Sequence, residues 1–390
     1  MTTKTLHPAG ANPGRSRSHN RQMVLGHVRR AGQIGRAEIA RASGLSTQAV
    51  SNIIADLAGD GLLLEGERVS SGRGLPAVQY SLNPAGGYAL GVEIRPDVLL
   101  VALLDLNGDT VFSRRTPLVD TRPEEVTAQI LTLRKAALTH AGGDPARLMG
   151  AGIVMPGPFG TASAAQKGLE LPEWSDIDAN LWFTTALDLP VFVENDANAA
   201  AMAERNGGAG EGVSHYAYLY FGAGLGLGIV TNGQLMQGAF GNAGEIGHIT
   251  VPSGNGAVVL EQAVSRLSLQ AHLAENGIAA ATSDALAQLY DASDPHLMGW
   301  LNQAAEPLTH AITTIENLCD PQTIILGGAM PDQILDHLIV ACALSDRSVS
   351  NRDERELPRL MRGRSGRMSA TQGAAALVLN HSFTPRLTPH

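Results

Sequence analysis

Hydrophobic residues near the start of the chain recur at helical spacing in three short segments. They predict one helix that ends near Gly32, a second over 37–42 that ends at Gly44, and a third that begins after Ser46 and ends at Gly61. Serine is a favoured N-cap, which supports the start of the third helix. Two short helices joined by a glycine-containing turn are the sequence form of a helix-turn-helix.

The third predicted helix carries a polar face opposite its apolar stripe. This face is formed by Thr47, Gln48, Ser51 and Asn52. Side chains early in a recognition helix can reach base edges in the major groove: amides can pair with adenine, and hydroxyls can bond bases or phosphate. We therefore predict that these four residues contact DNA. The alternative is a three-helix bundle whose polar face is merely solvated.

A two-stranded wing is predicted immediately after these helices. Residues 62–65 and 68–82 favour two strands around the glycine-rich tip 70–74, where Arg73 lies between two glycines. An arginine on such a tip suits insertion into a narrow minor groove, and the alternative is an ordinary solvated loop arginine. A turn-rich linker follows, and we place the winged helix-turn-helix domain at residues 18–85.

The remaining 300 residues repeat one theme, in which a strand meander is followed by helices. The first unit begins with strands and a helix over 88–141, and the second begins with a hairpin over 216–231. Two successive units predict a two-lobed α/β fold with a cleft between the lobes. We place the first lobe at 86–205, completed by about 375–390, and the second lobe at 206–374.

Polar residues follow a predicted buried strand over 191–193. Asn195 and Asp196 come directly after it, where α/β folds place ligand-binding groups. A carboxylate there could act as a general base for a hydroxyl, or could only accept a hydrogen bond from one. The alternative is a helix cap, because Asn and Asp are common N-cap residues.

Two further segments carry candidate chemistry. The glycine-rich run 221–228 could let backbone amides approach phosphate oxygens, although such runs also form plain hairpins. Glu245 and His248 place a carboxylate close to an imidazole, and together the two groups can bind vicinal hydroxyls. Alternatively, both are ordinary surface side chains.

Charge divides the chain in the same way as the hydrophobic pattern. Residues 1–85 hold ten Lys and Arg against five Asp and Glu, whereas the remainder holds 18 against 32. A basic module on an acidic body fits a nucleic-acid-binding head on a soluble sensor or enzyme. The length of 390 residues, with 44% hydrophobic and 17% charged residues, indicates a globular chain of two or three domains.

Several protein classes are excluded by composition. Two cysteines, Cys319 and Cys342, are too few for a disulfide scaffold. The first twenty residues contain no apolar stretch and hence no signal peptide, and no run of 18 apolar residues occurs. We therefore expect a cytoplasmic protein without a membrane partner. Residues 1–17 are polar, contain Pro and Gly, and are predicted to be disordered.

Together these features resemble the ROK family, named for repressors, open reading frames and kinases, over nearly the whole chain. Within it, the chain is similar to sugar-responsive repressors with an N-terminal winged helix-turn-helix. The resemblance is carried by six ordered motifs: Gly72-Arg73-Gly74-Leu75-Pro76, Gly152-Ile153-Val154-Met155-Pro156-Gly157-Pro158, Glu194-Asn195-Asp196-Ala197-Asn198, the glycine run, Gly244-Glu245-Ile246-Gly247-His248 and Ile325-Leu326-Gly327-Gly328. It implies a two-lobed actin/RNase H-like sugar-kinase fold.

The resemblance also implies a ligand and partners. A monosaccharide or sugar derivative would lie between the lobes, with Asn195 and Asp196 on one side and Glu245, His248 and Glu261 on the other. In the family's kinases, the residue that matches Asp196 is the general base. The implied partners are operator DNA, the sugar effector and further copies of the chain in a homodimer or homotetramer.

Three departures from the family's kinase pattern separate a regulator from an enzyme. The Asp-x-Gly-Gly-Thr phosphate loop is replaced over 93–97 by Glu-Ile-Arg-Pro-Asp, and Gly-Thr-Gly is replaced over 222–224 by Gly-Ala-Gly. Bulky residues remove the loop geometry that positions phosphates. The family's zinc site uses one His and three Cys, but residues 249–259 contain no cysteine, so we expect neither metal nor cofactor.

We therefore predict a non-catalytic regulator of carbohydrate uptake and catabolism genes. Relief of repression by sugar is the expected response, although the sequence leaves activation open. Two alternatives remain: an active ATP-dependent sugar kinase that also binds DNA, and a DNA-binding scaffold protein that responds to no ligand.

Overall fold

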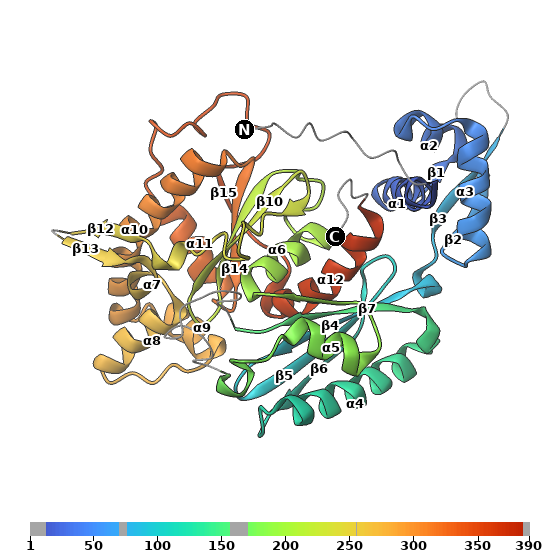
Figure 1. Cartoon of the computed structure of the whole chain (residues 1–390). Coiled ribbons are helices and arrows are strands. Elements are labelled where there is room, and N and C mark those ends of the chain that lie inside the picture. Colours follow the sequence, from blue (N-terminus) through green and yellow to red (C-terminus); the bar gives the residue numbers. More distant parts are fainter. Residues whose placement is uncertain (1–12, 70–75, 157–170, 255, 385–390) are drawn as a thin grey trace, which may run out of the picture.

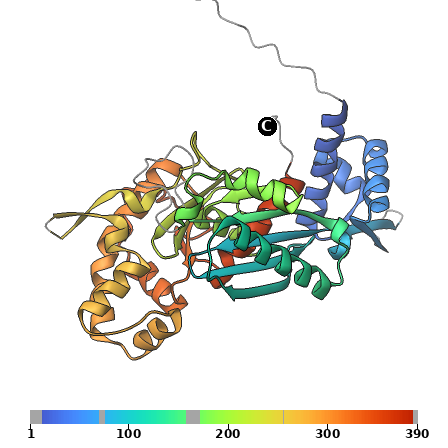
Figure 2. The same cartoon turned by 60° about the horizontal axis from the view of Figure 1, so that its bottom comes forward.

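A small head joined to a two-lobed body makes up the protein (Figure 1). The structure is a computed structural model, and it describes residues 13–69, 76–156, 171–254 and 256–384. In Figure 2 the head lies at one end of the molecule, beside the first lobe, and the helices of the second lobe lie at the other end.

Helices and a small sheet form the described part of the head. They are α1 (Pro13–Ala31), β1 (Ile34–Gly35), α2 (Arg36–Ser43), α3 (Thr47–Gly59), β2 (Leu63–Val69) and β3 (Ala77–Leu82), with the strands in the order β1-β3-β2. Gly44 ends α2 with a φ of 70°, a conformation that glycine adopts at little cost, so the chain turns directly into α3. The predicted helix-turn-helix and the two wing strands are present.

The first helix begins earlier than the sequence predicts. Residues 1–17 have the composition of a disordered segment, yet α1 already begins at Pro13. Arg17 in its second turn pairs with Asp56 of α3 at 2.6 Å, although both side chains are exposed and the pair contributes less than about 1 kcal/mol. The polar composition of this segment gave no indication of the helix, which contacts α3 in the folded head.

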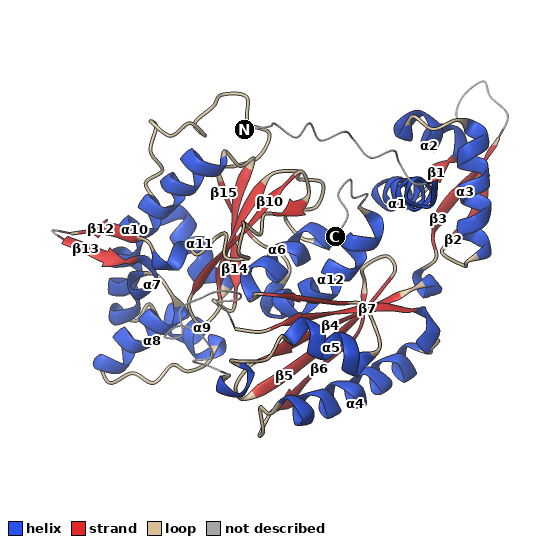
Figure 3. Cartoon of the chain, in the orientation of Figure 1, coloured by secondary structure: helices blue, strands red, loops and turns tan. Residues whose placement is uncertain are grey.

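The first lobe is built on a five-stranded sheet in the order β6-β5-β4-β7-β8 (Figure 3). Its elements are β4 (Tyr88–Ile94), β5 (Val98–Asp105), β6 (Thr110–Pro117), α4 (Pro123–Ala141), β7 (Leu148–Val154), α5 (Ala179–Leu187) and β8 (Val191–Glu194). β5 runs antiparallel to β4 and β6, whereas β7 is parallel to β4 and β8. Helices α4 and α5 cover one face, and the C-terminal helix α12 (Ser369–Phe383) covers the other.

The second lobe has its own five-stranded sheet in the order β11-β10-β9-β14-β15. Its elements are β9 (Tyr216–Phe221), β10 (Leu225–Thr231), β11 (Gln234–Leu235), β12 (Thr250–Ser253), β13 (Gly256–Val259), α7 (Leu260–Ala263), α8 (Arg266–Glu275), α9 (Ser283–Asp291), α10 (Pro295–Cys319), β14 (Thr323–Gly328), α11 (Asp332–Ala341) and β15 (Leu360–Arg362). The helices α8 to α11 share a hydrophobic core with one face of this sheet.

Two helices, α6 (Asp196–Gly207) and α12, lie side by side between the two sheets (Figure 1). Their close approach depends on glycine. A Cβ at Gly373 of α12 would overlap the carbonyl oxygen of Ala199 in α6, and a Cβ at Gly152 of β7 would overlap that of Ala374. The two helices therefore form one closely packed layer that joins the lobes.

The head packs directly against this helical layer. Val28 of α1 and Phe383 of α12 belong to one continuous hydrophobic core. A Cβ at Gly26 would lie 2.8 Å from the Phe383 carbonyl oxygen, and the Gln22 Nε2 donates a hydrogen bond to the His381 carbonyl at 3.1 Å. The head is therefore attached to the layer that lies between the lobes.

Candidate functional site

The junction between β8 and α6 positions Asn195 and Asp196. Asn195 is the N-cap of α6, and its Oδ1 accepts a hydrogen bond from the Asn198 amide at 2.8 Å. The capping alternative is therefore correct for this oxygen, while the cap does not use the Nδ2 of Asn195. Asp196 lies in the first helical turn, where the positive end of the helix dipole stabilises its carboxylate.

The glycine-rich turn between β9 and β10 brings residues of both lobes together. A Cβ at Gly222 would lie 3.0 Å from Oδ2 of Asp196 in the first lobe, and a Cβ at Gly224 would lie 2.9 Å from Oε2 of Glu261 in the second. Because Gly222 and Gly224 have no side chains, the turn leaves room for the carboxylates of Asp196 and Glu261, which approach it from α6 and α7.

Glu245 and His248 lie beside Glu261 on the second lobe. Glu245 precedes a 3-10 turn over Ile246–His248 that packs on β10 and α7, and His248 is the last residue of this turn. A Cβ at Gly247 would lie 3.3 Å from Oε2 of Glu261, and Nε2 of His248 lies 3.6 Å from Oε2 of Glu245. Both side chains are largely exposed, so they are open to a ligand.

A contact between the lobes also holds the start of α6. The buried Glu194 accepts hydrogen bonds from Asn198 Nδ2 at 2.9 Å and from the Asn195 amide at 3.1 Å. Its second oxygen accepts one from Nε2 of Gln237, at 2.9 Å, in the second lobe. Gln237 lies in a polar loop with no local motif, so the sequence offered no signal for this contact.

An ion pair joins the altered loop after β4 to the strand itself, between the half-buried Arg95 and the buried Glu93. Arg95 contacts Oε1 of Glu93 through Nε at 2.6 Å and through Nη2 at 2.5 Å, and Thr371 Oγ1 donates to the other Glu93 oxygen at 2.6 Å. Burial by itself would lower the pKa of Arg95, but the charges of Glu93 and Asp196 raise it above the usual value. Arg95 is therefore a fixed cation close to Asp196.

A second arginine, Arg266, flanks the glycine-rich turn. Its Nε donates a hydrogen bond to the Gly222 carbonyl at 3.0 Å. Burial and the nearby charge of Arg95 lower the pKa of Arg266. Two cations thus lie near the turn, and sequence reasoning missed Arg266 because it belongs to no motif.

The polar face of α3 is open to solvent. Thr47, Gln48 and Asn52 are exposed, while Ser51 is half-buried and donates to the Thr47 carbonyl at 2.8 Å. Gln48 Nε2 donates to Asn52 Oδ1 at 3.0 Å, and the opposite face of the helix is buried. Arg73, predicted for the wing tip, lies outside the described residues.

The segment where zinc-binding relatives would carry cysteines is a hairpin of β12 and β13. Within the described ranges, no cluster of three or more His, Cys, Asp or Glu side chains is arranged to hold a metal ion. In the same part of the chain, every helix is too short or too polar to cross a bilayer.

Comparison with known proteins places these features in context. The model of the ROK family matches residues 89–381. The chain is 28% identical over 235 residues to a xylose repressor of Bacillus spizizenii, and this match spans only 60% of each protein.

Solved structures share the fold. One is a ROK family transcriptional regulator, a homologue of the E. coli MLC protein, with a TM-score of 0.72 and 24% identity over 95% of this chain and 97% of its own. Another is a ROK family glucokinase from Streptomyces griseus in complex with glucose and AMPPNP, with a TM-score of 0.57 and 25% identity over 75% of this chain and 99% of its own. The predicted fold class, a winged helix-turn-helix with a two-lobed sugar-kinase-like body, is confirmed.

Proposed function

The chain belongs to the ROK family, and from that premise we propose that it is a DNA-binding transcription regulator controlled by a monosaccharide or sugar derivative. The sugar binds between the lobes, to Asn195 and Asp196 on one side and to Glu245, His248 and Glu261 on the other. The observation that carries this proposal is the meeting of Asp196 and Glu261, from opposite lobes, at the glycine-rich turn over 222–224.

The DNA partner is an operator read by α3 in the major groove. The exposed amides of Gln48 and Asn52 suit adenine, and the hydroxyls of Thr47 and Ser51 suit bases or phosphate. The protein acts as a homodimer or homotetramer, so that two heads engage a pseudo-palindromic site with half-sites in successive major grooves. The regulated genes serve carbohydrate uptake or catabolism, and sugar relieves their repression.

Helix α6 provides the physical link between sugar and DNA. Its first residue is Asp196, and near its other end Asn206 accepts a hydrogen bond from Arg29 of α1 in the head. At 1.5 Å per residue, these two ends lie roughly 15 Å apart. A sugar that closes the lobes shifts α6 and hence the head, provided that it binds one arrangement more tightly than the other.

Several features favour a regulator over a kinase. Phosphoryl transfer depends on backbone amides that surround the phosphates. In this chain the corresponding segment carries Arg95, which pairs with Glu93 and lies close to Asp196. We therefore assign no catalytic role to Asp196, and sugar-dependent ADP formation at ordinary kinase rates would contradict this assignment.

The proposal is tested by replacing the central carboxylate. With a panel of monosaccharides that includes xylose and glucose, the wild-type protein is expected to show a ligand-dependent rise in Tm that corresponds to about 2–4 kcal/mol at saturating sugar. Asp196→Ala should lose this rise because the ring hydroxyl loses its acceptor, while DNA binding in gel-shift assays stays unchanged.

The matched control is Asp176→Ala, which removes an exposed carboxylate elsewhere in the first lobe. It should keep the wild-type response. A normal sugar response in Asp196→Ala would refute the assigned cleft, and the lack of any response in the wild-type protein would favour a scaffold that binds DNA alone.

A further inference from the structure

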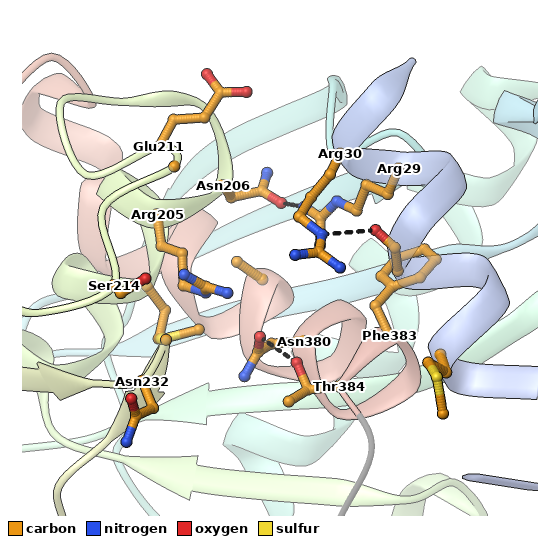
Figure 4. Close-up of a pocket in the computed structure, with 16 residues that line it drawn as sticks. Arg29, Arg30, Arg205, Asn206, Glu211, Ser214, Asn232, Asn380, Phe383 and Thr384 are labelled. Carbon is orange, nitrogen blue, oxygen red and sulfur yellow. Dashed lines mark hydrogen bonds between the residues drawn. The ribbon is translucent and has the colours of Figure 1, made fainter. Parts of the chain in front are cut away.

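A second pocket lies where the head meets the body, at the far end of α6 from Asp196 (Figure 4). It has a volume of about 380 Å³, and its walls come from α1, α6, α12, the segment between α6 and β9, and the loop after β10. Pockets of this size hold small metabolites. None of the predicted sugar-binding residues lines it.

Three arginines line this pocket. Arg29 and Arg30 come from the last turn of α1, and Arg205 comes from α6. Figure 4 shows the guanidinium groups of Arg30 and Arg205 extending into the pocket from opposite sides. Arg29 packs over the Phe383 ring, with its guanidinium carbon 4.8 Å from the ring centre, and donates a hydrogen bond to Asn206.

One carboxylate, that of Glu211, also lines the pocket, so three arginines face a single acidic residue. Among the described residues, no Asp or Glu oxygen lies within 4 Å of these three guanidinium groups. Burial and the charge of Arg205 lower the pKa of Arg29 to about 10, against an opposing effect of Glu211. Burial also lowers the pKa of Arg205, and the charge of Arg30 adds to this effect. The arginines stay protonated near neutral pH and repel one another.

The negative ends of nearby helices account for only part of the stabilisation of these clustered arginines. The C-terminal ends of α1, α6 and α12 lie nearby, and the partial negative charge of each stabilises a cation. The Arg30 Nε donates a hydrogen bond to the Gly26 carbonyl at 3.3 Å, and its Nη2 lies 3.1 Å from Nδ1 of His27. Arg205, however, donates no hydrogen bond to any other residue in the described part of the chain. Its planar group of N–H donors is therefore available to a ligand that displaces water from the pocket.

We propose that this pocket binds a phosphorylated small molecule, whose phosphate is held by Arg30 and Arg205. Guanidinium groups bind phosphate through two parallel, charge-assisted hydrogen bonds, and a dianion offsets the repulsion between the cations. The polar side chains of Ser214, Asn380 and Thr384 suit the hydroxyl groups of the remaining part. Because its walls belong to both head and body, a bound ligand fixes the position of α1 relative to α6.

The test is titration calorimetry of the full-length protein in phosphate-free buffer. Inorganic phosphate and glycerol 3-phosphate are the probes, and glycerol is the uncharged comparison. Saturable binding of at least one phosphate, without binding of glycerol, is expected. Equal affinity for both phosphates would identify free phosphate as sufficient, and tighter binding of the ester would identify an organic phosphate.

Arg205→Gln should weaken this binding at least tenfold, because a neutral amide cannot form the bidentate contact. Arg30→Gln, at an exposed position that tolerates substitution, repeats the measurement if Arg205→Gln fails to fold. Arg115→Gln, at an exposed arginine of β6, is the matched control and should bind as the wild type does. Asp196→Ala should also keep phosphate binding, which separates this pocket from the sugar cleft.

Two outcomes would overturn the proposal. One is the absence of saturable binding by either phosphate at millimolar concentration, which would leave the arginines as partners of the helix ends. The other is a phosphate affinity within twofold of the wild type in folded Arg205→Gln and Arg30→Gln.

Discussion

At the scale of single residues, the missing side chains of glycines decide how closely the central helices approach. Gly152 of β7 faces the Ala374 carbonyl of α12 with no space for a methyl group, whereas Gly207 at the end of α6 has open space around its Cβ position. Substitution at Gly152 therefore tests the close packing of α12, whereas substitution at Gly207 tests only the conformational cost of glycine in a helix.

Gly152→Ala is expected to destabilise the protein by about 3 kcal/mol, because α12 must shift away from the sheet. Urea unfolding followed by circular dichroism measures the change. Gly207→Ala is the control, and it should be neutral or stabilising by up to about 1 kcal/mol, since alanine is the better helix former. Equal stability of the two variants would show that α12 does not pack as described.

At the scale of elements, α3 combines two faces with separate roles. Val50, Ile53, Ile54 and Leu57 are buried in the head, so they hold the helix in place. Gln48 and Asn52 are exposed and hydrogen-bonded to each other, which fixes the orientation of both amides. Changes on the exposed face should therefore affect recognition without affecting the fold.

Asn52→Ala is expected to reduce affinity for an operator selected from random-sequence DNA by about 1–3 kcal/mol, with relaxed preference at one base pair. Fluorescence anisotropy measures the affinity, and the free energy of unfolding should change by less than about 0.5 kcal/mol. Asn302→Ala, at an exposed position of α10, is the matched control. Unchanged operator affinity in Asn52→Ala would remove this residue from the interface.

At the scale of the whole molecule, head and body meet through α1, α6 and α12. The hydrophobic core runs without a break from Val28 of the head to Phe383, and Arg29 adds a hydrogen bond to Asn206 of α6. This junction lies at the opposite end of α6 from Asp196, so in the proposed mechanism the signal from the cleft enters the head here.

Arg29→Met is expected to uncouple the two sites, because it removes the guanidinium group that lies over the Phe383 ring and donates the hydrogen bond to α6. Sugar affinity should stay within twofold of the wild type, while the effect of sugar on operator affinity falls at least fivefold. Anisotropy titrations with and without sugar measure both quantities. Arg115→Met should keep full coupling, and full coupling in Arg29→Met would exclude this route.

Local sequence patterns were sufficient to predict much of this structure. Helical spacing and the glycine at position 44 defined the helix-turn-helix, and a buried strand followed by polar residues located Asn195 and Asp196. Such features depend on neighbours within a few positions, so the sequence alone reveals them. The same locality explains why the early start of α1 was missed, since its partner Asp56 lies 39 residues beyond Arg17.

The sequence by itself determined the helix-turn-helix, the two-lobed α/β class and most of the candidate sugar-binding residues, because each depends on the order and spacing of nearby residues. Only the tertiary structure decided that Asp196 meets the glycine turn beside Glu261, that Arg95 pairs with Glu93, and that three arginines surround a pocket under the head. Those arrangements arise where α6 and α12 pack between the sheets. Packing joins residues far apart in the chain, and no local periodicity records which of them will meet.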